Sequence, residues 1–190
     1  MVAWSDLFLP ALVATVLVFV ASSLIHMALR LHRSDYRPFA NEDEVRAALR
    51  KGAQGPGQYM TPFCRDPKEQ STPEMQKKFV EGPIAVVCIG PSGTIAIGPF
   101  LAKWVAYSFL VSIVAGYLAR ATLAPGAAYL AVFQVVGVAA WLAYAWQSPA
   151  DSIWKSRPWS VTWGVMFDGL VYAALTAGSF AWLWPALPSA

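Results

Sequence analysis

"LFLPALVATVLVFVASSLIHMAL" (residues 7–29) holds no Lys, Arg, Asp or Glu. A transmembrane helix needs about 20 mainly apolar residues, so this stretch is long enough to cross a bilayer once. A cleavable signal peptide carries basic residues before its apolar core, whereas here Arg30, Arg33 and Arg37 follow the core. This order of charges predicts a retained membrane helix with the N-terminus outside.

Three later stretches have the same apolar character: Pro99–Ala119, Ala127–Trp146 and Val161–Trp184. The chain is 57% hydrophobic and 13% charged, whereas soluble domains carry about 25% charged residues. We therefore predict an all-α transmembrane protein, a four-helix membrane bundle with a small α+β cytoplasmic insertion between helices 1 and 2. The predicted regions are an N-terminal helix (1–29), the insertion (30–98) and a three-helix membrane region (99–190).

The basic residues predict the orientation, because cytoplasmic loops are enriched in Lys and Arg. Of the 14 basic residues, eleven lie between Arg30 and Lys103. Lys155 and Arg157 lie between the third and fourth apolar stretches, and Arg120 alone lies at the opposite end. We expect a multi-pass protein with both termini outside and with residues 30–98 and 148–160 in the cytoplasm. The lipid bilayer is the expected environment, and no nucleic-acid partner is predicted.

The polar insertion contains start and stop signals for short elements. Asn41 precedes an acidic first turn and Gly52 closes the stretch, which predicts one helix. "STPEMQKKFVEG" predicts a second helix, capped by Ser71 or Thr72 and with Pro73 in its first turn. "PIAVVCIG" and "TIAIG", separated by "PSG", predict a β-hairpin.

Asp168 is the most informative single residue, because a charge within a membrane helix costs roughly 2.5–3.5 kcal/mol on insertion scales. The topology places His26 and Lys103 in the same half of the bundle, so the three residues form a candidate intramembrane polar cluster. Two interpretations stay open for Asp168. It serves a proton or ion relay or a headgroup site, or it makes a structural ion pair. Lys103 has the further option of extending to the membrane surface.

The two histidines, His26 and His32, do not share one face of an α-helix. Six residues turn the helix by about 600°, which leaves the two side chains about 240° apart after one full turn. A joint metal or haem site is therefore disfavoured, whereas the i, i+4 spacing suggests that Ser22 orients His26. Cys64 and Cys88 form no zinc or redox motif. No metal or cofactor is predicted, although haem or pigment contact is left open. No catalytic motif is present, which favours a non-enzymatic protein.

Two stripes of small residues predict close helix packing. They lie at four-residue spacing in the second and fourth membrane stretches: Ser108, Ser112 and Gly116; Gly169, Ala173, Ala177 and Ala181. In a membrane, such stripes mark contacts within a bundle or with another protein.

Several segments together resemble a group of uncharacterised bacterial inner-membrane proteins of similar length: "SSLIHM", "HRSDYRPF", "PGQYMTPF", "EGPIAVV" and "FDGLVYAALTAGSFAWLWP". The resemblance covers nearly the whole chain. It implies four helices in a bacterial inner membrane, and it implies no activity and no catalytic residue.

Three functional hypotheses follow. The first is a non-enzymatic accessory, stabilising or assembly subunit of a larger membrane complex, respiratory or photosynthetic, in contact with other membrane protein subunits. The second is a small transporter or a lipid- or quinone-binding protein that uses His26, Lys103 and Asp168. The third is a membrane-bound enzyme or haem protein.

Overall fold

The computed structural model describes residues 1–187 and is mostly helical (67% helix), with one small two-stranded sheet. The chain divides into two compact units. The helical unit comprises residues 1–35, 96–152 and the chain from 158 onward, and the second unit comprises residues 36–95 and 153–157.

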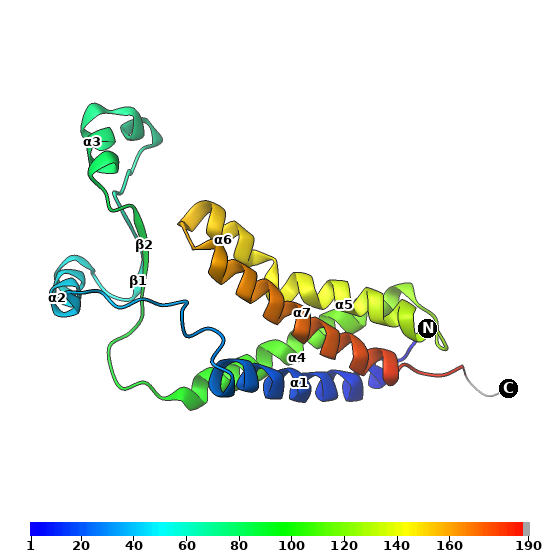
Figure 1. Ribbon diagram of the computed structural model, residues 1–190. Helices are drawn as coiled ribbons and strands as arrows, with labels where there is room; N and C mark the ends of the chain where they lie inside the picture. The colour runs from blue at the N-terminus through cyan, green and yellow to red at the C-terminus, as the bar shows by residue number, and fades with distance from the viewer. Residues whose placement is uncertain (188–190) are drawn as a thin grey trace. The chain divides into compact units, whose positions relative to one another are not determined.

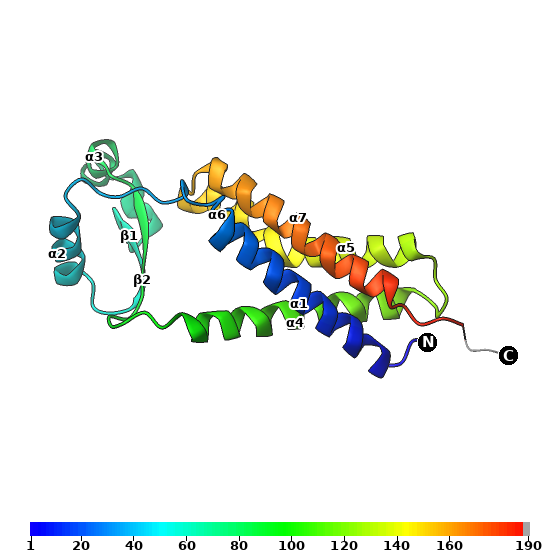
Figure 2. The same ribbon diagram turned by 60° about the horizontal axis from the view of Figure 1, so that its bottom comes forward.

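Four helical segments in the helical unit are long and apolar enough to cross a membrane, as the sequence predicts. The first, Ser5–Ala28, joins a 3-10 turn (Ser5–Leu7), α1 (Phe8–Ser23) and a π-helical turn (Leu24–Ala28). The others are α4 (Ile97–Thr122), α5 (Tyr129–Ala145) continued by α6 (Gln147–Lys155), and α7 (Trp159–Trp182). Figures 1 and 2 show α1 running beside both α4 and α7.

Residues 148–160, which connect the third and fourth apolar stretches, are largely helical, because α6 occupies most of them. Pro149 stands in the first turn of α6, where a helix tolerates proline because its N–H has no helical partner there. The buried hydroxyls of Ser148 and Ser152 lie 3.3 and 2.5 Å from the Thr162 hydroxyl near the start of α7. These contacts tie the beginnings of α6 and α7 together.

Small residues allow the helices to approach closely, and both stripes lie buried inside the bundle. A Cβ added to Gly169 would lie 2.5 Å from the Ala145 Cβ, and one added to Gly116 would overlap the Phe180 ring. Phe180, Val132 and other fully buried side chains fill the space between α4, α5 and α7. The stripes are therefore used within this chain, and they require no partner protein.

Arg120 is the basic residue at the end of the helical unit that holds the N-terminus, and contacts with the N-terminal residues hold its side chain in place. The Arg120 Nε donates a hydrogen bond to the Val2 carbonyl at 2.7 Å, and its guanidinium lies 4.8 Å from the centre of the Trp4 ring. Trp4 in turn stacks on Tyr117, with ring centroids 5.7 Å apart.

The second unit contains the two predicted helices, α2 (Glu42–Gly52) and α3 (Pro73–Glu81), and a 3-10 turn (Pro67–Ser71). The Thr72 hydroxyl caps α3 by accepting from the Met75 N–H. The β-hairpin predicted around "PSG" is wrong. Strand β2 (Ala85–Ile89) pairs antiparallel with β1 (Gly57–Thr61), from Gly57 opposite Ile89 to Thr61 opposite Ala85.

The cause of this error is that a short β-branched run does not reveal its pairing partner. The second half of the predicted hairpin reads "TIAIG" (residues 94–98), and α4 already begins within it at Ile97. The true partner strand, "GQYMT", lies in a stretch that its prolines and glycines assign to a loop.

Candidate functional site

The polar site lies where the first long apolar helical segment, Ser5–Ala28, ends. The helix widens there into a π-helical turn, in which the Leu29 N–H bonds to the Leu24 carbonyl at 2.8 Å. Such single π turns occur frequently at functional sites. The His26 ring lies in this turn, and its Nδ1 is 3.0 Å from the Ser22 carbonyl oxygen. A carbonyl only accepts, so Nδ1 carries the proton and Nε2 is left to face the bundle.

The chain then turns back over the end of the helix. Arg30 adopts the left-handed conformation (φ 52°), and residues 31–34 form a turn. This path brings the His32 ring against the His26 ring, with centroids 4.6 Å apart and planes at 16°. Gly164 of α7 leaves room for it, since a Cβ there would lie 3.1 Å from the His32 Cε1.

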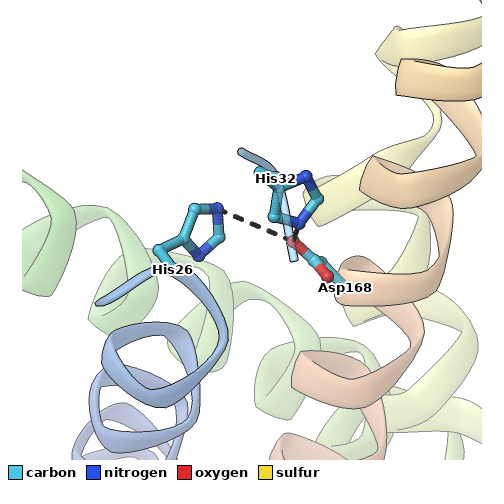
Figure 3. Close-up of side chains that lie close together, drawn as sticks. All are labelled: His26, His32 and Asp168. Carbon is cyan, nitrogen blue, oxygen red and sulfur yellow. Dashed lines mark ion pairs between the residues drawn. The ribbon is translucent and has the colours of Figure 1, made fainter. Parts of the chain in front are cut away.

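Asp168 on α7 is the meeting point of the two histidines (Figure 3). Its Oδ2 lies 2.8 Å from His32 Nε2 and 3.7 Å from His26 Nε2. Its side chain is 7% exposed, against 16% for His32 and 50% for His26. The Nε2–Oδ2 contact of His32 is an ion pair, because Nε2 completes no hydrogen bond of good geometry despite the short distance.

The structure thus brings two of the three predicted cluster residues together and separates the third. His26 reaches Asp168, whereas Lys103 is exposed on α4, outside the group of His26, His32 and Asp168. His32, which the sequence places apart from His26, completes the group. The two rings lie close together, contrary to the expectation from helical periodicity, because the chain is not one continuous α-helix from residue 26 to 32. Ser22 does orient His26, through its carbonyl and not its hydroxyl.

His32 is held from its other side by Asp35. Its Nδ1 lies 2.7 Å from Asp35 Oδ2, and the Nδ1–H donates a hydrogen bond to this carboxylate oxygen. Burial lowers the pKa of His32, but the hydrogen bond to Asp35 and the negative charges of Asp168 and Asp35 outweigh it. The pKa of the imidazole is therefore raised above its ordinary value of 6.5.

A pocket of about 450 Å³ opens next to this cluster and is lined by side chains from all four long apolar helical segments. His26 and Asp168 form its polar end. Its walls are mainly apolar and aromatic side chains of the helical unit: Met27, Ile97, Leu101, Trp104, Tyr144, Val165 and Tyr172. Trp104, Tyr144 and Tyr172 pack in tilted and edge-to-face pairs, with ring centroids 5.6–6.1 Å apart.

Two buried polar atoms at this pocket have no hydrogen-bond partner among the described residues: Asp168 Oδ1 and the Tyr172 hydroxyl. Buried polar groups are nearly always hydrogen-bonded, so each orphan requires an explanation. By contrast, Trp104 Nε1 is satisfied by the Ser22 hydroxyl at 3.0 Å. The sequence does not single out Tyr172, and the only available signal is its position one helical turn after Asp168.

A second pocket of about 200 Å³ lies on the other side of Asp168 and is lined by His32, Asp35, Gly164 and Phe167 among others. Asp168 therefore stands between two hollows, with His26 bordering the larger and His32 the smaller.

No protein-family model matches this sequence, and comparisons with curated proteins and with solved structures find no significant similarity. The function is therefore argued from the site alone.

Proposed function

We propose that the chain is an integral protein of a bacterial inner membrane that binds a small amphiphilic molecule in the 450 Å³ pocket. Its four apolar helices cross the bilayer, with both termini outside and residues 30–98 in the cytoplasm. The distribution of Lys and Arg supports this orientation.

The observation that carries the binding proposal is the pair of orphaned polar atoms in an otherwise apolar pocket. Ligand pockets are typically apolar, with a few placed polar groups that fix orientation. A carboxylate oxygen accepts a hydrogen bond and a phenol donates one. A hydroxyl-bearing headgroup satisfies both atoms, while its apolar body lies along the aromatic wall. Quinols and glycerolipids share this chemistry.

Replacing Tyr172 with phenylalanine tests this proposal, because it keeps the ring and removes the orphaned hydroxyl. We expect Y172F to bind a short-chain ubiquinol or a diacylglycerol about tenfold more weakly, since one hydrogen bond contributes about 0.5–1.5 kcal/mol. The measurement is isothermal titration calorimetry of the full chain in detergent, with each probe titrated separately. The probe that binds to the wild type identifies the headgroup class.

Tyr117→Phe is the matched control, because Tyr117 lies near the opposite end of the bundle, stacked on Trp4, and does not line the pocket. Its affinity for the probe should equal that of the wild type. If neither probe binds to the wild type, or if Y172F and Y117F bind equally well, the pocket is not an amphiphile site of this kind.

A second function, that of an accessory subunit of a larger membrane complex, is favoured by the second unit. Among its residues 36–95, Met75 alone is buried. Large apolar side chains are exposed on this unit: Tyr36, Phe39, Met60, Phe63, Val80, Ile84 and Ile95. A segment that buries so little apolar surface gains little hydrophobic stabilisation to offset the conformational entropy lost on folding. Contact with a partner protein would bury more of this surface.

Blue-native electrophoresis of mild detergent extracts tests the accessory role. We expect the full chain to migrate in a band well above 20.6 kDa together with other membrane proteins. A variant with Phe63 and Ile84 changed to serine should lose that band, whereas a Leu110→Ser variant on exposed α4 surface should keep it. Migration as the lone chain or its homo-oligomer contradicts this role.

A further inference from the structure

Three atoms that carry lone pairs converge at the end of the first membrane segment. The donor atoms of His26, His32 and Asp168 all lie within 4.8 Å of one another (Figure 3). A zinc ion with bonds of about 2.0–2.2 Å holds its tetrahedral ligands about 3.3 Å apart. The separations of 2.8 and 3.7 Å between Asp168 Oδ2 and the two Nε2 atoms bracket that value. Small side-chain rotations therefore suffice to close the three donors around one ion.

The Nδ1 atoms of both rings make the hydrogen bonds that are typical of metal-binding histidines. Such residues usually donate their second ring N–H to a carbonyl or a carboxylate, which fixes the tautomer and the ring orientation. His26 Nδ1 donates to the Ser22 carbonyl, and His32 Nδ1 donates to Asp35. In both neutral rings the lone pair is thus on Nε2, the atom that faces Asp168.

An ion pair between the histidines and Asp168 accounts for only part of this arrangement. One proton on His32 Nε2 neutralises the contact at 2.8 Å, but His26 Nε2 at 3.7 Å is too far for a hydrogen bond. Asp168 Oδ1 is also without a partner, in a residue that is only 5% exposed. A single cation placed among the three donors accepts the lone pairs of both Nε2 atoms and of Asp168 Oδ2 at once.

We propose that His26, His32 and Asp168 bind one divalent transition-metal ion, with Asp35 as the carboxylate that orients His32. Two imidazoles and one carboxylate suit Zn²⁺, and also Fe²⁺ and other first-row metals, better than the all-oxygen set that Mg²⁺ or Ca²⁺ requires. Three protein ligands leave a coordination position open, as in metal sites that bind a further molecule. The 450 Å³ pocket borders two of the ligands, His26 and Asp168. This metal site does not depend on amphiphile binding.

Metal titration of the full chain tests the proposal. The protein is purified in detergent with a tag free of histidine, stripped with a chelator, and titrated at pH 8 with Zn²⁺ and with Co²⁺. We expect one ion per chain by elemental analysis, and a Co²⁺ absorption spectrum with nitrogen and oxygen ligation. His32→Gln and Asp168→Asn should each weaken binding by more than about 100-fold, and Asp35→Asn by about tenfold, as outer contacts of metal ligands do.

Two control variants separate this site from other donors. Asp6→Asn removes a carboxylate whose contacts lie in the N-terminal turn, and the Cys64→Ser/Cys88→Ser double variant removes both free thiols. Both should bind Zn²⁺ as the wild type does, and Zn²⁺ should raise their Tm but not the Tm of Asp168→Asn. The absence of stoichiometric binding, loss of binding in the cysteine variant, or a Co²⁺ spectrum unchanged in His32→Gln each overturns the proposal.

Discussion

Phe180→Ala is expected to lower the free energy of unfolding by about 3 kcal/mol, at the low end of the range for buried phenylalanines in soluble proteins. Phe180 is 0% exposed, and its ring fills the space left by Gly116 on α4. In a bilayer the unfolded helices are still surrounded by apolar lipid, so little transfer free energy is lost on truncation. What remains is the cost of the cavity and of the lost packing contacts between α4 and α7. Thermal or SDS-induced unfolding of the purified protein measures it.

A double-mutant cycle makes this prediction specific to the Gly116–Phe180 contact. Gly116→Ala in the wild type should be destabilising, because the new Cβ overlaps the Phe180 ring. In the Phe180→Ala background the same change should be neutral or stabilising, since the methyl group enters the cavity. Phe100→Ala, at a position 63% exposed near the start of α4, is the control and should leave stability nearly unchanged. Equal effects of Gly116→Ala in both backgrounds would contradict the packing described here.

The four long apolar helices were predictable from the sequence, because each carries its own signal. A run of about 20 apolar residues reports a helix without reference to its neighbours, and all four expected segments are helices. The errors arise where a partner matters. Strand β2 does not encode that its partner is β1, almost thirty residues earlier. α6 extends into the expected connection between the third and fourth apolar stretches, where hydroxyl contacts with Thr162 stabilise it.

Asp168 and His26 were predictable from the sequence, whereas His32 was not, because its place depends on the path of the chain after the helix. A buried charge such as Asp168 requires partners wherever the helices lie, so the search for a polar neighbour leads to His26. His32 was missed because helical periodicity is an argument about one continuous helix. The π turn over Leu24–Ala28 and the left-handed Arg30 end that periodicity, and neither has a signature in the sequence. Lys103 lies on the expected helix but is exposed, since a long flexible side chain is free to reach the surface.

The pocket and the histidine cluster share Asp168, which links the two proposals chemically. With a metal ion in place, the Asp168 carboxylate is a ligand of the ion, and the open coordination position is available to a hydroxyl or carbonyl oxygen. Without metal, the orphaned Oδ1 itself accepts from the headgroup. Calorimetric titrations of the amphiphile with and without Zn²⁺ therefore show whether the metal ion changes the affinity of the pocket for the amphiphile.

His32→Ala, in protein stripped of metal, is expected to destabilise the fold by about 3–5 kcal/mol, because breaking a buried ion pair leaves an uncompensated charge. Asp168 is 7% exposed, and the other imidazole, His26, lies 3.7 Å away and is 50% exposed. His26→Ala should therefore cost much less, about 0–1 kcal/mol, as exposed pairs do. Adding Asp168→Leu to His32→Ala should restore most of the loss, because an apolar residue of similar volume requires no partner. If the double variant is no more stable than His32→Ala, the Asp168 charge is not the cause.

The pH dependence of this effect has a definite sign. The groups that face His32 are Asp35 on its own turn, Asp168 on α7 and the stacked His26. Because the folded protein raises the pKa of His32 above 6.5, the stabilisation from its charged form is fully present below pH 6.5. It is lost as the pH rises through the higher folded value. In the presence of chelator, wild type and His32→Ala should therefore differ more in unfolding free energy at pH 6 than at pH 9. The reverse order would mean that His32 stabilises the fold as a neutral ring, as a packing element and not as the cation that pairs with Asp168.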